Sequence, residues 1–279
     1  MSESKLITKN AKSNLAFAFA CLPKERRDDM CHLYAFCRIV DDLADSPDIP
    51  MDKKLSGLQS WKECFSDPDS LEKADLTEIQ KQTLTIRDRY KIDNQLFLDL
   101  IAGCYSDLQP SRRFSDWEDL QKYTYQVASA VGLISIKIFG CSHPDSEKYA
   151  VNLGHALQLT NILRDVGEDL SDNLRVYLPE NDMIRFQYSE RDLVGRVYDG
   201  RFISMMQYIS ERAEYYYTEA EKNFHPDDAK ALRSSEAMRK IYYGILKKMQ
   251  TDKFRVFEQR YSLSKPKKVW LLLTSLAGL

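Results

Sequence analysis

The spacing of apolar side chains is the feature that most restricts how this chain can fold. Along almost all of its 279 residues, apolar side chains recur every three or four positions. This is the pattern of one face of an α-helix, and no segment shows the strict alternation of a half-buried strand. Only 10 glycines and 9 prolines interrupt the pattern, whereas a β-sandwich or barrel needs many turns. The sequence therefore predicts an all-α helical bundle.

Helix-breaking residues divide this pattern into segments. Pro23 opens the first segment, Pro47 and Pro50 close it, and Gly140 ends a later one. The expected helices span residues 24–45, 55–65, 76–90, 96–105, 117–139, 144–169, 202–224 and 229–249. We expect a loop holding Pro179 before the helix at 202, and a short apolar helix after the basic residues 265–268. No repeat, linker or change of composition divides the chain, so we expect one domain over residues 1–279.

Charge and cysteine content exclude several classes of protein. Forty Lys and Arg against 42 Asp and Glu leave a formal net charge of −2, which gives no reason to expect a nucleic-acid partner. The six cysteines form no C-x-x-C pair and no zinc-ligand spacing with the four histidines, which is typical of core cysteines in a reducing compartment. Residues 1–12 lack the apolar stretch of a secretory signal. The apolar run 269–279 is shorter than the ~20 residues of a membrane-spanning helix, so we expect a cytoplasmic protein.

An acidic stripe interrupts the apolar face of the first long helix. Asp41 and Asp45 are one helical turn apart, at the edge of the apolar face and beside Tyr34. Two carboxylates at this spacing repel each other, and burial of either one without a partner is unfavourable. Arg38 lies close to the same face but supplies a single positive charge. The pattern therefore predicts a further cation nearby.

A second polar stripe lies on the helix expected at 144–169. That helix is apolar nearly all round, which is typical of a buried helix. Four polar residues fall within one narrow wedge of it: Gln158, Asn161, Asp165 and Asp169. A polar wedge on a buried helix indicates that these side chains line a cavity.

Either stripe alone could be a solvated face or could pair with basic residues on neighbouring helices. Two stripes on apolar helices far apart in the sequence favour a different arrangement, in which at least four carboxylates converge across the bundle core. Such a set of oxygen ligands suits Mg²⁺ when substrate phosphates complete its coordination, and Asn161 can add a carbonyl oxygen. Neither wedge contains a histidine, which disfavours zinc and di-iron chemistry.

The chain resembles the squalene/phytoene synthase family, whose members join two prenyl diphosphates head to head. The resemblance covers residues 13–272. Its main marks are YAFCRIVDDLAD at 34–45, YTYQVASAVG at 123–132, QLTNILRDVGED at 158–169 and RVYLP at 175–179. Within the family it is most similar to the bacterial presqualene diphosphate synthases. The resemblance implies an isoprenoid-synthase helical bundle with a central apolar cavity.

The resemblance also implies a role for individual residues. Asp41 and Asp45 resemble the first magnesium-binding motif, and Asn161, Asp165 and Asp169 the second, with two or three Mg²⁺ ions bound together with the substrate diphosphate. Six residues are similar to those that hold the diphosphates: Asn14, Tyr34, Arg38, Gln158, Arg164 and Arg175. Tyr123 and Tyr242 match catalytic tyrosines that reach into the same cavity. The resemblance implies a catalytic role for the four motif aspartates as well.

The chain departs from the family pattern at two places. The connection from Asp169 to Arg175 is one residue longer than usual, so Arg175 resembles the family's basic position in residue type only. Many relatives have a serine followed by an aromatic residue where this chain has Asn14 and Leu15. Part of the diphosphate site or of the chain pocket is therefore expected to differ.

The implied chemistry requires a long apolar cavity that keeps water away from an allylic cation. Candidate wall residues, each of which could equally be ordinary core, are Leu15, Phe19, Phe36, Val127, Val131, Ile134 and Leu157. The small residues Ala128, Ser129, Ala130 and Gly132 leave room beside their helix for a second helix or for a prenyl chain.

We expect Mg²⁺-dependent condensation of two farnesyl diphosphates to presqualene diphosphate. The alternative is a phytoene synthase that uses two geranylgeranyl diphosphates, and a third possibility is a non-catalytic relative that assists assembly or binds lipid. Reduction to a squalene-type C30 product needs NADPH, for which no G-x-G-x-x-G motif is present. Lys265, Lys267, Lys268 and Trp270 could provide transient membrane contact, and the oligomeric state is not predicted.

Overall fold

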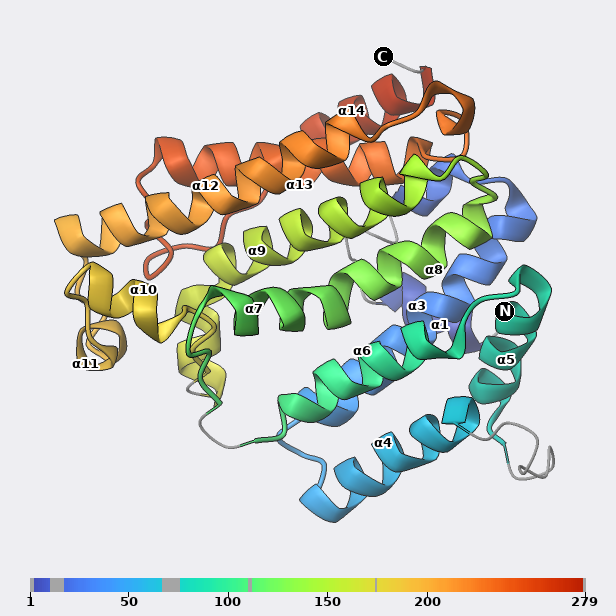
Figure 1. Ribbon diagram of the computed structural model, residues 1–279, viewed down its shortest axis with the longest axis horizontal. Helices are drawn as coiled ribbons and strands as arrows, with labels where there is room; N and C mark the ends of the chain where they lie inside the picture. Colours follow the sequence, from blue (N-terminus) through green and yellow to red (C-terminus); the bar gives the residue numbers. More distant parts are fainter. Residues whose placement is uncertain (1–2, 11–17, 67–75, 110–111, 174, 278–279) are drawn as a thin grey trace.

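The computed structural model describes residues 3–10, 18–66, 76–109, 112–173 and 175–277, and every regular element in these ranges is helical. The all-α prediction is therefore confirmed. The helices are α1 (Glu3–Asn10), α3 (Lys24–Asp45), α4 (Met51–Ser66), α5 (Glu78–Tyr90), α6 (Asn94–Ser106), α7 (Trp117–Thr124), α8 (Ala130–Phe139), α9 (Asp145–Asn173), α10 (Glu180–Arg185), α11 (Glu190–Val194), α12 (Gly200–Lys222), α13 (Arg233–Thr251) and α14 (Lys265–Ala277). In Figure 1, α7, α8 and α9 run through the middle of the molecule, between α12–α14 on one side and α3–α6 on the other.

The observed helices differ from the expected ones at three places. The polar helix α1 was not predicted, and the expected loop around Pro179 contains the short helices α10 and α11. The segment expected as one helix at 117–139 is interrupted by a π-helical turn at Tyr125–Ser129. A π-turn inserts one extra residue into the helix, so it rotates the side chains that follow it and is often found at functional sites.

The hydrophobic core has two parts that meet at the π-turn. One part joins α9, α12 and α13, and the other joins α3, α4, α5 and α6 with α8. Val127, in the π-turn, packs against both. Close packing also fixes the α8–α9 hairpin, because a Cβ atom on Gly154 would lie 2.5 Å from the Cα of Ser129.

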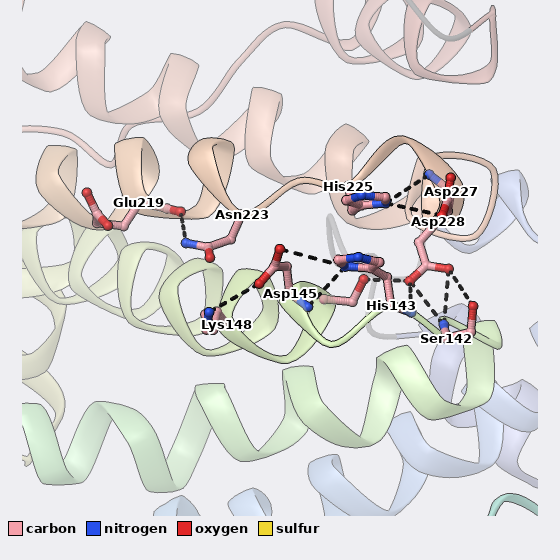
Figure 2. Close-up of polar contacts among 10 residues, drawn as sticks. Ser142, His143, Asp145, Lys148, Glu219, Asn223, His225, Asp227 and Asp228 are labelled. Atoms are coloured by element: carbon pink, nitrogen blue, oxygen red, sulfur yellow. Dashed lines mark hydrogen bonds and ion pairs between the residues drawn. The ribbon is translucent and has the colours of Figure 1, made fainter.

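Two loops are fastened together at the end of the bundle where α9 begins. The buried carboxylate of Asp228 accepts hydrogen bonds from the backbone N–H groups of Ser142 and His143 and from the hydroxyl of Ser146. Figure 2 shows the imidazoles of His143 and His225 lying face to face, with ring centroids 3.4 Å apart. These contacts join the α8–α9 loop to the α12–α13 loop.

Helix α14 packs on α13 and leaves an apolar strip in solvent. Leu271 and Leu272 are buried, whereas Val269, Trp270 and Leu273 are 45%, 61% and 57% exposed. Across the described part of the chain, no helix has the length and apolar character needed to span a bilayer.

Candidate active site

The carboxyl end of α3 carries the first acidic pair. Asp41 and Asp45 are both half-buried. Arg38 forms ion pairs along the same helix with Asp41 at 3.2 Å and with Asp42 at 2.6 Å. Burial and then the charge of Asp45 raise the pKa of Asp41 to about 7, against the opposing effect of Arg38. Arg38 therefore does not outweigh burial and the repulsion from Asp45 at the Asp41 carboxylate.

The carboxyl half of α9 carries the second acidic set. Asp165 pairs with Arg164 at 2.5 Å and with Arg260 at 3.1 Å. Asp169 lies one turn further along the helix and has no comparable ion pair among the described residues. Burial and the charge of Asp165 raise the pKa of Asp169 to about 7, although Arg175 acts in the opposite direction.

The two acidic sets face each other. Arg175, which follows α9, has its Nη1 atom 2.5 Å from Oδ1 of Asp45 in α3. The charge of Asp45 also contributes to the raised pKa of Asp169, which agrees with the two carboxylates lying on the same side of the bundle. The structure thus brings together residues that are more than one hundred positions apart in the sequence, and Arg175 stands between them.

Asn161 supplies an unpaired oxygen at the same place. Its side-chain Oδ1 is buried and has no hydrogen-bond partner among the described residues, while its Nδ2 donates weakly to Gln158 at 3.4 Å. A buried carbonyl oxygen without a partner is unfavourable, so it suits a site that is completed by a cation.

The donor set fits a hard divalent cation that is shared with a ligand. Within the described ranges, no three acidic, histidine or cysteine side chains converge closely enough to hold an ion by themselves. Mg²⁺ is usually held by one or two carboxylates together with substrate phosphates and water. The residues that would hold such ions are Asp41, Asp45, Asn161, Asp165 and Asp169.

An apolar cavity of about 200 Å³ leads away from this acidic centre between α8, α9 and α13. Gln158 and Asn161 line the end near the acidic centre, and Phe139 and Tyr149 line the other end. Three of the expected wall residues line it: Val127, Val131 and Leu157. The lining extends from Val127 in the π-turn to Phe139 at the end of α8, roughly 18 Å at about 1.5 Å per residue.

Other expected wall residues lie elsewhere. Phe36 packs against Trp61 and Phe65 in the hydrophobic part built on α3, and Phe19 and Ile134 are also buried in that part of the core. Asn14 and Leu15 lie outside the described residues. The small residues make room for a neighbouring helix and for a cavity. Ser129 packs closely on α9, while Ala128 and Gly132 line the cavity.

The two tyrosines have different surroundings. Tyr242 lines the cavity, and the guanidinium of Arg164 is 6.0 Å from the centroid of its ring. Tyr123, in contrast, does not line this apolar cavity. Its hydroxyl donates to Asp107 at 2.9 Å, and its ring stacks on Tyr177 at 5.5 Å.

Sequence reasoning missed two charged residues near the centre, Asp107 and Arg260, and it assigned a third, Lys268, only to the basic segment at 265–268. Burial raises the pKa of Asp107 to about 6, while the Tyr123 hydroxyl and Arg175 oppose the shift. Arg260 binds Asp165 and Glu168 from the segment after α13, and burial together with Arg164 lowers the pKa of Lys268. Asp107 and Arg260 are single charged residues outside a periodic stripe, so no sequence pattern marked them.

The remaining expected ligand-binding residues surround the centre. Tyr34 contacts Phe19 edge to face at 6.2 Å. Gln158 lies one turn before Asn161 on α9 and lines the cavity. Arg164 is buried beside Asp165. The fold and this set of groups suit a helical enzyme whose substrate carries a phosphate group and an apolar chain.

Comparison with known proteins identifies the family. The sequence model of the squalene/phytoene synthase family matches residues 8–267, so the chain belongs to that family. Its members are prenyltransferases that use a divalent metal with diphosphate substrates, and this chain is a prenyltransferase.

Individual relatives carry different names. The chain is 33% identical to the 15-cis-phytoene synthase of Synechocystis sp., over 90% of this chain and 77% of that protein. It is 31% identical to the presqualene diphosphate synthase of Rhodopseudomonas palustris, over 94% and 92%. Among solved structures it is similar to a ligand complex of a dehydrosqualene synthase, with a TM-score of 0.82, 27% identity, and coverage of 98% of this chain and 94% of that one.

Proposed function

We propose that the protein catalyses the Mg²⁺-dependent head-to-head condensation of two farnesyl diphosphates to presqualene diphosphate, with release of diphosphate. The observation that carries the proposal is the meeting of two acidic helix ends and the unpaired Asn161 oxygen at one end of an apolar cavity. This arrangement suits a substrate with a charged head and an apolar chain.

Residues at the acidic centre would act on the diphosphate, and residues along the apolar cavity would act on the prenyl chain. Bound magnesium ions would neutralise the charge that develops on the departing diphosphate. Arg164 and Arg38 are placed to donate hydrogen bonds to phosphate oxygens as the C–O bond breaks and the diphosphate leaves with its electron pair. The cavity excludes water from the allylic cation, and the ring of Tyr242 can stabilise its charge. The double bond of the second chain then attacks, and loss of a proton closes the cyclopropane.

The choice of a C15 substrate is supported by the far end of the cavity. Buried Phe139 and Tyr149 limit its length there, which favours farnesyl over a chain one isoprene unit longer. The second candidate is the synthesis of phytoene from two geranylgeranyl diphosphates, and the 33% identity to a phytoene synthase favours it.

Product analysis separates the two candidates. Purified protein is incubated with Mg²⁺ and each diphosphate in turn, and the lipid products are identified by mass spectrometry. We expect a C30 cyclopropyl diphosphate from farnesyl diphosphate without added NADPH. A C40 product alone would contradict the C15 assignment, and the absence of any product would favour a non-catalytic role.

We also propose that α14 makes transient contact with a membrane on the cytoplasmic side, where an apolar product could leave. The exposed strip of Val269, Trp270 and Leu273 lies beside the basic residues Lys265 and Lys267. This combination suits an anionic lipid surface.

A further inference from the structure

A second cavity, of about 180 Å³, lies against Asp45 and shares no lining residue with the apolar cavity. It is enclosed by the end of α3, the start of α4, the end of α6 and the segments that precede α7 and follow α9. Its charged lining residues are four cations and two carboxylates: Lys54, Arg112, Arg113, Arg175, Asp45 and Asp107. The lining therefore has an excess of positive charge.

Two of the four cations are already neutralised. Arg113 pairs with Glu190, outside the cavity, and Arg175 pairs with Asp45 at 2.5 Å. Their side chains complete the wall but do not require a ligand.

The other two cations have weaker partners in the described part of the chain, and the guanidinium of Arg112 also lies over the ring of Phe114 at 4.5 Å. Lys54 donates to the main-chain carbonyl of Ala44 at 2.9 Å. Arg112 is 3.8 Å from Asp119, and its Nη1 atom is buried with no hydrogen-bond partner. A buried N–H of a charged group that is left unpaired costs free energy, so this side chain is suited to an anion that enters the cavity.

The chemistry of the lining indicates which anion fits. Guanidinium groups bind phosphate oxygens through two parallel hydrogen bonds, and a lysine adds a compact charge. Arg175 connects the cavity to the acidic centre, because the same side chain pairs with Asp45 and acts on Asp169. We propose that this cavity binds a diphosphate anion and receives the diphosphate that the reaction releases. That the bound anion is the released diphosphate rests on the proposed condensation.

Calorimetry in EDTA isolates this cavity from the acidic centre. Without metal, the carboxylates of the acidic centre repel diphosphate, so binding heat reports the cationic cavity. Inorganic diphosphate is titrated into the wild-type protein, into a Lys54→Ala/Arg112→Ala variant, and into Lys53→Ala as a control. Lys53 is exposed, belongs to the same helix as Lys54 and does not line the cavity, so its replacement removes the same single charge as Lys54→Ala.

We expect wild type and Lys53→Ala to bind with the same Kd and the double variant at least tenfold more weakly. If Arg112→Ala destabilises the fold, as circular dichroism would reveal, Lys54→Ala alone should still weaken binding severalfold. Equal affinity in wild type and Lys54→Ala, or no binding to wild type at millimolar diphosphate, would overturn the proposal.

A second titration distinguishes the possible sources of the anion. ADP presents the same diphosphate with a nucleoside attached, and we expect it to bind no more tightly than inorganic diphosphate. Tighter binding of ADP would assign the cavity to a nucleotide and overturn its role in product release. The result is independent of the condensation itself, because product formation is measured separately with Mg²⁺. Normal products with no diphosphate binding in EDTA would refute only the cavity.

Discussion

Replacement of Asp169 by asparagine should make the metal-free protein more stable at pH 8 while it abolishes turnover. The pKa of Asp169 rises from 3.8 to about 7 because of burial and the neighbouring charge of Asp165. A folded-state pKa above the unfolded value means that the folded protein holds a proton that the unfolded chain has released. Stability therefore falls as pH rises from about 4 to 7.

The size of the effect follows from the shift. About three pKa units at 1.36 kcal/mol each give roughly 4 kcal/mol as an upper bound, since relaxation of the surroundings screens part of it. At pH 5, where the wild-type side chain is protonated in the folded state, the difference should shrink by more than half. In thermal terms the variant should gain several °C at pH 8.

The assay is thermal unfolding in EDTA at pH 5 and pH 8, followed by circular dichroism. Glu168→Gln is the matched control, because Glu168 is the preceding residue, is about half exposed and pairs with Arg260. We expect the control to be neutral or slightly destabilising at both pH values. A melting temperature for Asp169→Asn that equals or falls below wild type at pH 8 would refute the idea of a repulsive acidic centre.

Four further outcomes are expected. Mg²⁺ affinity in the presence of inorganic diphosphate should rise with pH towards 7, because Asp41 must lose its proton when the metal binds. Calorimetry in buffers of different ionisation enthalpy would measure the protons released. A pH-independent affinity would contradict this. Gly154→Ala should lose about 3 kcal/mol of unfolding free energy in urea, because the new Cβ would overlap Ser129, whereas Gly200→Ala, with open space around it, should be neutral. Phe139→Ala should raise kcat/KM for geranylgeranyl relative to farnesyl diphosphate, and an unchanged ratio would show that Phe139 does not limit chain length. Trp270→Ala should reduce flotation with anionic vesicles, and flotation equal to wild type would exclude α14 as the contact.

Much of the fold was predictable because apolar periodicity reports buried helix faces directly. The first long helix begins and ends where Pro23 and Pro47 predict, at Lys24–Asp45. The polar helix α1 gave no such signal, and helices as short as α10 and α11 offer too few turns for a periodic pattern. The π-turn at Tyr125–Ser129 was not predictable because its five residues, YQVAS, are all types that ordinary helices contain.

The site was predictable in part for a related reason. Repeated carboxylates on an apolar helix are conspicuous, so Asp41, Asp45, Asp165 and Asp169 could be picked out and expected to meet. Which groups neutralise them depends on three-dimensional contacts. Arg260 reaches Asp165 from a segment far along the chain, and no local pattern encodes that pairing.

The position of Tyr123 was likewise not encoded in the local sequence pattern. Its spacing within the helix is compatible with a cavity on either side. The choice is made by Asp107 and Tyr177, which come from different segments and hold its hydroxyl and its ring.

The proposed function depends most on the carboxylates of α3 and α9 binding cations together. Crystals grown with Mn²⁺ and a non-reacting thio analogue of farnesyl diphosphate would locate the ions by anomalous scattering. We predict metal peaks bridged by the diphosphate, with ligands from Asp41 or Asp45 on one side and from Asn161, Asp165 or Asp169 on the other. Metal bound to one helix alone, with the analogue's diphosphate elsewhere, would contradict the account.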